Sequence, residues 1–282
     1  MSSVSLQPIV CCLGDPLAGN PMQLLMERAF AAAGLDWRFL SFEVPGLHLE
    51  DAVKGMRALG FQGAAFTSPH QVAVIPFLDR LTDEATAIGA VNCAFVSDGQ
   101  WVGDNTDGPA FSQALRRHLD PTDAHVVVLG AGGTARAVAS ELARSSIASL
   151  TLVNRTAERA ERLAGELKER CQIDARASAW SGNWEVPAET TLLVQATTVG
   201  WCEPDERPAV DLSACSETLV VADVIFNPPE TRLIQEARRR GLTTMSGVEM
   251  MAGQVALAYE RWTGSEPTGQ VIRETLEEYL EV

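Results

Sequence analysis

The most informative stretch of this chain is His125-Val-Val-Val-Leu129-Gly130-Ala131-Gly132-Gly133-Thr134-Ala135. The run after His125 is apolar without interruption, which is typical of a strand buried on both faces of a parallel sheet. The glycines then permit a tight turn, and the residues from Thr134 onward continue into a helix that is expected to end near Arg144. This order of strand, turn and helix predicts an α/β domain with a parallel sheet.

The glycine-rich turn fits the pattern G-x-G-x-x-A, with Gly130, Gly132 and Ala135 at its fixed positions. Such glycines let the backbone approach a pyrophosphate, and the helix N-terminus supplies N–H donors and a positive dipole end. Any tight strand-to-helix turn favours glycine, but the position directly after a buried strand favours dinucleotide binding. The residues expected to hold the pyrophosphate are Gly130, Ala131, Gly132, Gly133 and Thr134.

The end of the next strand bears on the choice of cofactor. An enzyme that uses NAD usually has Asp or Glu there, about 20 residues further on, to bind the ribose 2′-hydroxyl. This chain has Asn154, Arg155 and Thr156 at that point, with Arg159 one helical turn later. Because guanidinium groups bind a 2′-phosphate through charge and fork geometry, the sequence predicts NADP. The alternative is that both arginines are solvated surface charges.

Strands and helices alternate on both sides of this stretch. Further apolar runs lie at residues 150–153, 191–194 and 219–222, and a helical segment lies at 157–170. This alternation predicts a Rossmann-type, doubly wound parallel sheet. The N-terminal part alternates between strand-like and helix-like segments as well, and residues 76–88 are expected to contain one or two short helices.

We therefore expect an α/β protein with two domains. The N-terminal α/β domain, at residues 1–107, is expected to bind the substrate. Two helices at residues 249–280 are expected to pack back on it, so that it also includes residues 249–282. An NADP-binding domain is expected at residues 108–248, and a helix near residues 109–119 is expected to connect the two domains.

Composition and charge narrow the class of function. The chain has 282 residues, of which 46% are hydrophobic, and a formal net charge of −15, which disfavours nucleic acid and anionic membranes as partners. No apolar stretch reaches the ~20 residues of a membrane helix, and residues 1–8 lack the pattern of a signal peptide. The six cysteines form no CxxC pair, which favours reduced thiols and no metal site. We expect a cytoplasmic monomer or homodimer that binds a small-molecule substrate, but neither nucleic acid nor a membrane.

Polar residues interrupt the apolar pattern of the first domain at residues 67–71, 89–92 and 103–108. The last segment lies just before the expected domain junction, where two-domain α/β enzymes bind their ligands. Structural explanations exist for single residues, because Asp107 is suited to cap a helix and Asn92 to hold a turn. The segments therefore indicate a substrate site without identifying the substrate.

In combination, these segments resemble the shikimate dehydrogenases and the related quinate dehydrogenases. The matching residues extend through nearly the whole chain: 14–17, 67 and 69, 88–92, 103–108, 130–136, 154–156, 196–200, 223–228 and 247–254. Because the segments match as an ordered set, the resemblance is highly specific.

The resemblance implies hydride transfer between NADPH and a ring ketone, which is 3-dehydroshikimate in the main enzyme of the family, without a metal. The residues that it assigns to the substrate are Thr67, Asn92, Asp107 and Gln254, with Asn20 in the opening loop. The residues that it assigns to NADP are Gly130 to Thr134, Asn154, Arg155, Thr156, Arg159, Thr197, Val224 and Gly247.

Three departures from the family pattern concern the substrate. The family's lysine that partners the aspartate in proton transfer is Gln71 here, which makes Asp107 and Gln71 the candidate catalytic pair. Gln71 cannot transfer a proton near neutral pH, so Asp107 would act alone or through water. The family's S-x-S-P, whose hydroxyls hold the substrate carboxylate, is replaced by residues 17–21 without a serine, and a tyrosine near the end of the sheet is Phe226. His70, beside Gln71, is expected to be a packing residue.

These observations predict an NADP-dependent oxidoreductase of shikimate dehydrogenase type that acts on shikimate, quinate or an amino analogue. The alternative is a catalytically weak NADP-binding sensor or regulatory protein, which Gln71 would suit. The retained side chains of Asp107, Asn92 and Gln254 favour the enzyme, because a binding module needs no such polar set.

Overall fold

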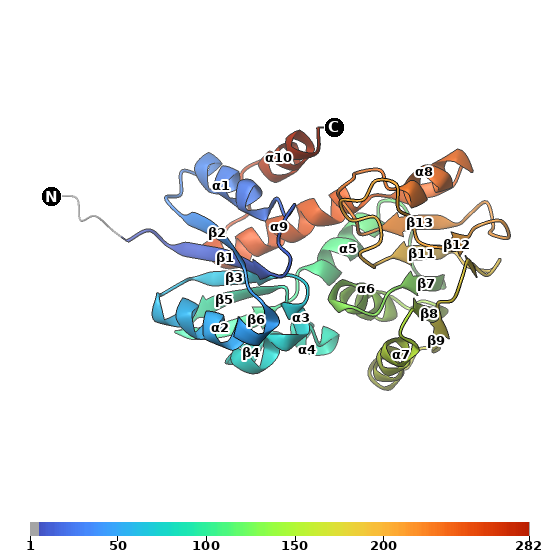
Figure 1. Cartoon of the computed structure of the whole chain (residues 1–282), viewed down its shortest axis with the longest axis horizontal. Coiled ribbons are helices and arrows are strands. Elements are labelled where there is room, and N and C mark those ends of the chain that lie inside the picture. Colours follow the sequence, from blue (N-terminus) through green and yellow to red (C-terminus); the bar gives the residue numbers. More distant parts are fainter. Residues whose placement is uncertain (1–5, 282) are drawn as a thin grey trace. The chain divides into compact units, whose positions relative to one another are not determined.

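The computed structural model describes residues 6–281, so the expectation about residues 1–8 lies partly outside the described residues. These residues form two compact units (Figure 1). Unit 1 comprises the residues up to Thr106 and those from Gln254 onward, and unit 2 comprises Asp107–Gly253. Within residues 6–281, no helix is long and apolar enough to cross a membrane, and no group of three or more His, Cys, Asp or Glu side chains is placed to hold a metal ion.

Unit 1 is built on a mixed sheet with the strand order β2-β1-β3-β5-β6-β4. Its elements are β1 (Ile9–Gly14), α1 (Met22–Ala32), β2 (Arg38–Glu43), η1 (Gly46–His48), α2 (Leu49–Ala58), β3 (Gly63–Phe66), α3 (His70–Ala73), η2 (Ile75–Phe77), β4 (Arg80–Leu81), α4 (Asp83–Ile88), β5 (Cys93–Ser97), β6 (Gln100–Asp104), most of α9 (Gly247–Thr263), and α10 (Val271–Leu280). Strand β1 is parallel to β2 and β3, whereas β5 is antiparallel to β3 and β6. The carboxyl ends of β1, β2 and β3 therefore meet at one edge of the sheet.

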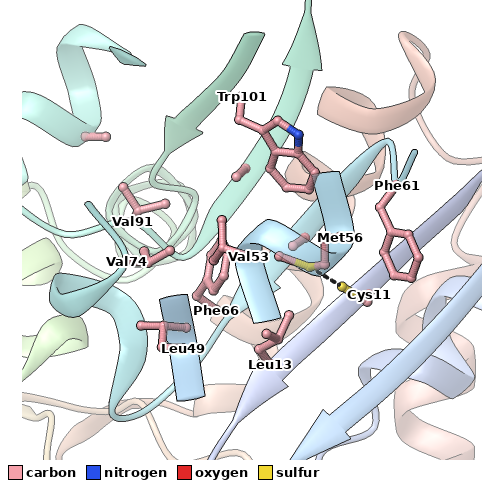
Figure 2. Close-up of a cluster of buried hydrophobic side chains, with 13 residues drawn as sticks. Cys11, Leu13, Leu49, Val53, Met56, Phe61, Phe66, Val74, Val91 and Trp101 are labelled. Carbon is pink, nitrogen blue, oxygen red and sulfur yellow. Dashed lines mark hydrogen bonds between the residues drawn. The ribbon is translucent and has the colours of Figure 1, made fainter. Parts of the chain in front are cut away.

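Apolar side chains cover this sheet on both faces. On one face, Leu49, Val53 and Met56 of α2 lie in one cluster with Leu13 and Phe66 from the sheet (Figure 2). This spacing along α2 gives the helix a continuous apolar face.

The C-terminal helices pack back on unit 1, as the sequence predicts. The rings of Phe30 and Tyr259 lie 5.6 Å apart, and Trp262 Nε1 donates to the Ala94 carbonyl oxygen over 2.9 Å. This approach requires Gly63, because a Cβ there would lie 2.4 Å from Trp262 Nε1. Helix α10 lies beside α1 (Figure 1).

Unit 2 is built on an all-parallel sheet with the order β14-β13-β11-β7-β8-β9. Its elements are α5 (Asp107–Leu115), β7 (His125–Leu129), α6 (Gly133–Ala143), β8 (Ser149–Asn154), α7 (Ala157–Cys171), β9 (Ala175–Ala179), β10 (Trp184–Glu185), β11 (Leu192–Gln195), β12 (Val210–Asp211), β13 (Val220–Asp223), α8 (Arg232–Arg239), β14 (Thr243–Met245) and the start of α9. The chain leaves β7 in one direction and returns to β11 on its other side, so the strand order reverses beside β7. The prediction of a Rossmann-type, doubly wound sheet is confirmed, and such sheets bind ligands beyond the carboxyl ends at this reversal.

Several short strands differ from the sequence-based expectation. Residues 76–88 contain the expected short helices, η2 and α4, but also the strand β4, while β6 and β9 were not predicted at all. Strand β6 ends in the buried Asp104, a residue that normally argues against a buried strand. Its carboxylate is satisfied by Arg261 Nε and Thr82 Oγ1, both at 2.6 Å, and no local pattern contains those partners.

Candidate functional site

The turn between β7 and α6 is shaped by glycine at two positions. Gly130 has a φ of +115°, and a Cβ there would lie 2.6 Å from the Ala196 carbonyl oxygen, so only glycine fits without strain. Gly132 is the N-cap of α6, and the space that its Cβ would occupy is open. Because no side chain caps α6, its first N–H groups are available to an anion.

The end of β8 lies beside this turn. Strands β7 and β8 are parallel, and the Gly130 N–H donates to the Val153 carbonyl oxygen over 2.8 Å. Asn154 Nδ2 then donates to the Thr156 carbonyl oxygen over 2.9 Å and so holds the loop that carries Arg155. A group bound at the glycine turn is therefore near the loop after β8.

Arg155 and Arg159 are exposed, and their side chains form no hydrogen bond or ion pair within residues 6–281. Several other arginines of unit 2 are paired with carboxylates, as Arg136 is with Glu166 and Arg207 with Glu236. Two unpaired guanidinium groups beside a glycine turn are chemically suited to a phosphate on the ribose of a dinucleotide.

The remaining residues assigned to the cofactor lie at or just beyond the ends of the neighbouring strands. Thr197 follows β11, where its N–H donates to Gln195 Oε1 over 2.6 Å. Val224 follows β13 and donates its N–H to the Gln195 carbonyl oxygen over 3.0 Å. Gly247 begins α9, and a Cβ there would lie 2.4 Å from the Ile225 carbonyl oxygen, so glycine lets α9 start against this edge. Unit 2 thus brings the predicted cofactor residues to one edge of its sheet.

Asp107 is buried in the first turn of α5. Thr134 Oγ1, near the start of α6, donates to Asp107 Oδ2 over 3.4 Å. The carboxylate of the candidate catalytic residue is therefore next to the helix that begins at the glycine turn.

In unit 1, Asn92 is the centre of a buried polar cluster. Asn92 Nδ2 donates to Thr106 Oγ1 over 2.9 Å and to Gln254 Oε1 over 3.3 Å, and Asn92 Oδ1 accepts from the Thr106 N–H over 2.8 Å. Asn92 and Gln254 are thus brought together although 162 positions separate them in the chain. Thr106 was not a predicted site residue, because its role depends on this contact.

Thr67 and Gln71 lie next to this cluster along the backbone. The Phe66 N–H donates to the Asn92 carbonyl oxygen over 2.8 Å, and the Val91 N–H donates to the Gln71 carbonyl oxygen over 2.7 Å. His70, between them, is fully buried, and its Nε2 donates to the Val44 carbonyl oxygen over 2.8 Å. Asp107 and Gln71 belong to different units, so their pairing stays a prediction.

The opening loop of unit 1 holds Asn20 in a structural role. Asn20 Oδ1 accepts from the Met22 N–H over 2.9 Å at the start of α1. The Leu17 N–H donates to Glu43 Oε2 over 3.0 Å. Glu43 was not a predicted site residue; only the pairing of β1 with β2, which sets Gly14 opposite Glu43, reveals it.

Phe226, where the family pattern has tyrosine, is a packing residue in unit 2. Its ring meets that of Trp201 edge to face, with the centroids 4.6 Å apart. The position is buried and apolar, so no hydroxyl is available there for a ligand.

Asp223, at the end of β13, is expected to make stability depend on pH. Burial raises the pKa of its carboxyl to about 7, although the hydrogen bonds that it accepts from the Ile225 N–H and the Thr231 hydroxyl lower the pKa. Between about pH 4 and 7 the folded state therefore binds more protons than the unfolded state, so the free energy of unfolding falls as pH rises, by at most about 4 kcal/mol. Asparagine resembles the neutral acid, so in Asp223→Asn the free energy of unfolding, measured by urea titration, should differ less between pH 5 and pH 8 than in the unmutated protein. Equal pH dependence in Asp223→Asn and the exposed control Asp98→Asn would show that Asp223 is ionised when folded.

The doubly wound sheet, the open glycine turn and the unpaired arginines define a dinucleotide-binding α/β oxidoreductase. Within this class the chain belongs to the shikimate dehydrogenase family. Residues 13–94 match the family model described as the shikimate dehydrogenase substrate binding domain, and residues 112–178 match that of shikimate / quinate 5-dehydrogenase.

Individual relatives cover almost the whole chain. The shikimate dehydrogenase (NADP(+)) of Methanopyrus kandleri is 43% identical over 278 residues, which cover 96% of each chain. The ligand-free crystal structure of 5-ketofructose reductase from Gluconobacter sp. strain CHM43 is 38% identical with a TM-score of 0.88, covering 96% of this chain and 98% of that one. The structure of shikimate 5-dehydrogenase from Thermus thermophilus with NADP(H) and shikimate is 32% identical with a TM-score of 0.84, covering 97% and 100%.

Proposed function

We propose that this enzyme catalyses the reversible, NADP-dependent reduction of a hydroxylated ring ketone to an alcohol. The observation that carries the proposal is the open glycine turn of unit 2 beside the unpaired Arg155 and Arg159. The names of the relatives from Methanopyrus kandleri and Thermus thermophilus, which include NADP and shikimate, support it.

The cofactor would be held by the edge of the sheet in unit 2. The first N–H groups of α6 would bind the pyrophosphate, and Arg155 and Arg159 would bind the 2′-phosphate. Thr197, Val224 and Gly247 would line the same edge. When bound, NADPH supplies the hydride.

The chain's own residues would then handle the proton and the hydroxyl groups. Asp107 would exchange a proton with the reacting oxygen, and the Thr134 hydroxyl, which donates to it, would orient the carboxylate. The amides of Asn92 and Gln254 and the hydroxyl of Thr67 offer neutral donors and acceptors for hydroxyl groups of the ring.

The identity of the ring is the finer part of the proposal. The pair 3-dehydroshikimate and shikimate is the reference, because the substrate-domain model and the named shikimate dehydrogenases support it. Quinate and amino analogues belong to the same panel. The keto sugar 5-ketofructose belongs there too, because a solved structure that is 38% identical to this chain is named a 5-ketofructose reductase.

The test is cofactor turnover with this panel. Purified protein should oxidise NADPH when given at least one of these ketones, and should reduce NADP⁺ when given the matching alcohol. A protein that binds NADPH but turns over none of the panel would support the sensor alternative. Failure to bind NADPH would overturn the proposal as a whole.

Replacing Gln71 with lysine is expected to raise the turnover of shikimate about tenfold, which is less than the ~10²–10⁴-fold that general acid–base catalysis typically contributes. Lysine adds a group that can carry a proton at a position where Gln71 carries only an amide. Gln62→Lys, which adds the same charge at an exposed position of unit 1, is the control. Steady-state kinetics that show equal kcat for Gln71→Lys and the unmutated enzyme would mean that position 71 takes no part in proton transfer.

A further inference from the structure

The opening loop of unit 1 is hydrogen-bonded to the carboxylate of Glu43. Glu43 is the last residue of β2 and lies opposite Gly14 in the parallel pair with β1. Its Oε2 accepts the N–H of Leu17, whereas its Oε1 has no hydrogen-bond partner within residues 6–281. Glu43 is exposed, so this oxygen is accessible to a ligand.

This carboxylate and Thr67, one of the proposed substrate residues, flank the end of β1 at Gly14. A Cβ on Gly14 would lie 2.4 Å from the Thr67 methyl group and 2.9 Å from a methyl group of Leu17. The side chains of Thr67 and Leu17 therefore both pack over Gly14, and the backbone N–H of Leu17 is hydrogen-bonded to the Glu43 carboxylate. A ligand that binds at Thr67 and extends over Gly14 would meet the Glu43 carboxylate on the other side of β1.

In the described part of unit 1, no free cation near Glu43 offsets this negative charge. The lysine and arginine residues of the unit are Arg28, Arg38, Lys54, Arg57, Arg80, Arg261 and Arg273. All except Arg80 are paired with a carboxylate of the same unit. Arg80 lies on β4, at the opposite end of the sheet from β2.

The other groups at this edge are neutral. The loop from Asp15 to Pro21 contains no serine or threonine, and Asn20 Oδ1 is engaged by Met22, which leaves its amide N–H groups as donors. With Thr67, Asn92 and Gln254 these groups can bind hydroxyls, but they offer no charge for a carboxylate. Asp15, also exposed, adds a second negative charge to the loop.

Resting on the proposed function, we infer that the substrate is a neutral polyhydroxylated ketone and its alcohol, and that Glu43 is the residue that disfavours acids. The Glu43 carboxylate accepts a hydrogen bond from a substrate hydroxyl and repels a substrate carboxylate. One such charge contact near a protein surface corresponds to roughly a tenfold change in affinity.

Shikimate and its methyl ester form a matched pair that differs in charge but keeps the ring hydroxyls. With NADP⁺, kcat/KM is expected to be about tenfold higher for the ester. The preference is expected mainly in KM, because Glu43 acts on binding. A higher kcat/KM for the acid would overturn the inference.

Glu43→Gln removes the charge and keeps an oxygen that can accept the Leu17 N–H. This variant is expected to improve kcat/KM for shikimate about tenfold and to leave the ester nearly unchanged. Glu50→Gln on α2, which removes an exposed carboxylate paired with Lys54, is the control and should change neither value. An equal response of acid and ester to Glu43→Gln would overturn the role of Glu43.

Calorimetry on the NADP⁺-loaded protein decides the case in which neither ring is turned over. Tighter binding of the ester supports the inference, whereas equal or weaker binding, or no binding of either, overturns it. The proposed function fails on a different readout, namely loss of NADPH binding or of turnover with every ketone of the panel.

Discussion

Asp107→Asn is expected to lower kcat by about 10²–10⁴-fold, the scale of general acid–base catalysis. The asparagine amide retains the shape of the side chain and can still accept the Thr134 hydroxyl, but it cannot exchange a proton. Asparagine also favours a helix N-terminus about as well as aspartate does, so α5 should be unaffected. Steady-state kinetics with the best substrate of the panel measure the effect.

Two measurements separate chemistry from folding in this experiment. The midpoint of thermal unfolding should be nearly unchanged in Asp107→Asn, and NADPH should bind as before. Asp98→Asn, at an exposed turn with a φ of +53° that asparagine tolerates, is the control and should keep full turnover. If Asp107→Asn also keeps full turnover, Asp107 serves only the helix, and the catalytic proposal is wrong.

The preference for NADPH over NADH is expected to be at least tenfold in Kd, about 1.4 kcal/mol, and Arg155→Asp is expected to abolish it. The substitution replaces an unpaired guanidinium with a carboxylate that repels the 2′-phosphate. NADH lacks that phosphate, so its affinity should change little. Fluorescence titration with both cofactors measures the four dissociation constants.

Arg162→Asp makes the same change of charge further along α7 and controls for long-range electrostatics. It should weaken NADPH binding less than Arg155→Asp does, because Arg162 lies further along the helix than the two arginines proposed to hold the 2′-phosphate. Equal affinities for NADPH and NADH in the unmutated protein would refute the cofactor prediction at the outset.

The fold was predictable wherever the residues that determine an element lie within one short segment of sequence. The apolar run 126–129 and the glycines after it predict a strand buried on both faces and the start of a helix, and β7 and α6 lie there. Strand β6 could not be predicted, because its buried Asp104 depends on Arg261, which follows it by 157 positions. Strand β9 was missed because its alanine, arginine and serine residues lack the apolar character of an inner strand, and it lies at the sheet edge.

In the candidate site, too, some residues could be predicted from the local sequence, whereas others depend on contacts between distant segments. The glycine turn and Arg155 could be predicted as cofactor residues because they follow consecutive strands of one sheet. By contrast, Glu43 ends a strand with an ordinary alternating pattern, and only the pairing of β1 with β2 sets it at the opening loop. Thr106 gains its role from the side chain of Asn92 in the same way.

The divided chain of unit 1 has a consequence for the order in which the protein forms. A ribosome completes unit 2, which is continuous from Asp107 to Gly253, before it has made the second part of unit 1. Until residues 261 and 262 emerge, the Asp104 carboxylate lacks its guanidinium, and the Ala94 carbonyl lacks its indole N–H. A buried carboxylate without a counter-charge is costly, so the sheet of unit 1 cannot close in its final form at that stage. The middle of the chain is therefore ready to fold during synthesis, whereas its beginning must wait for its end.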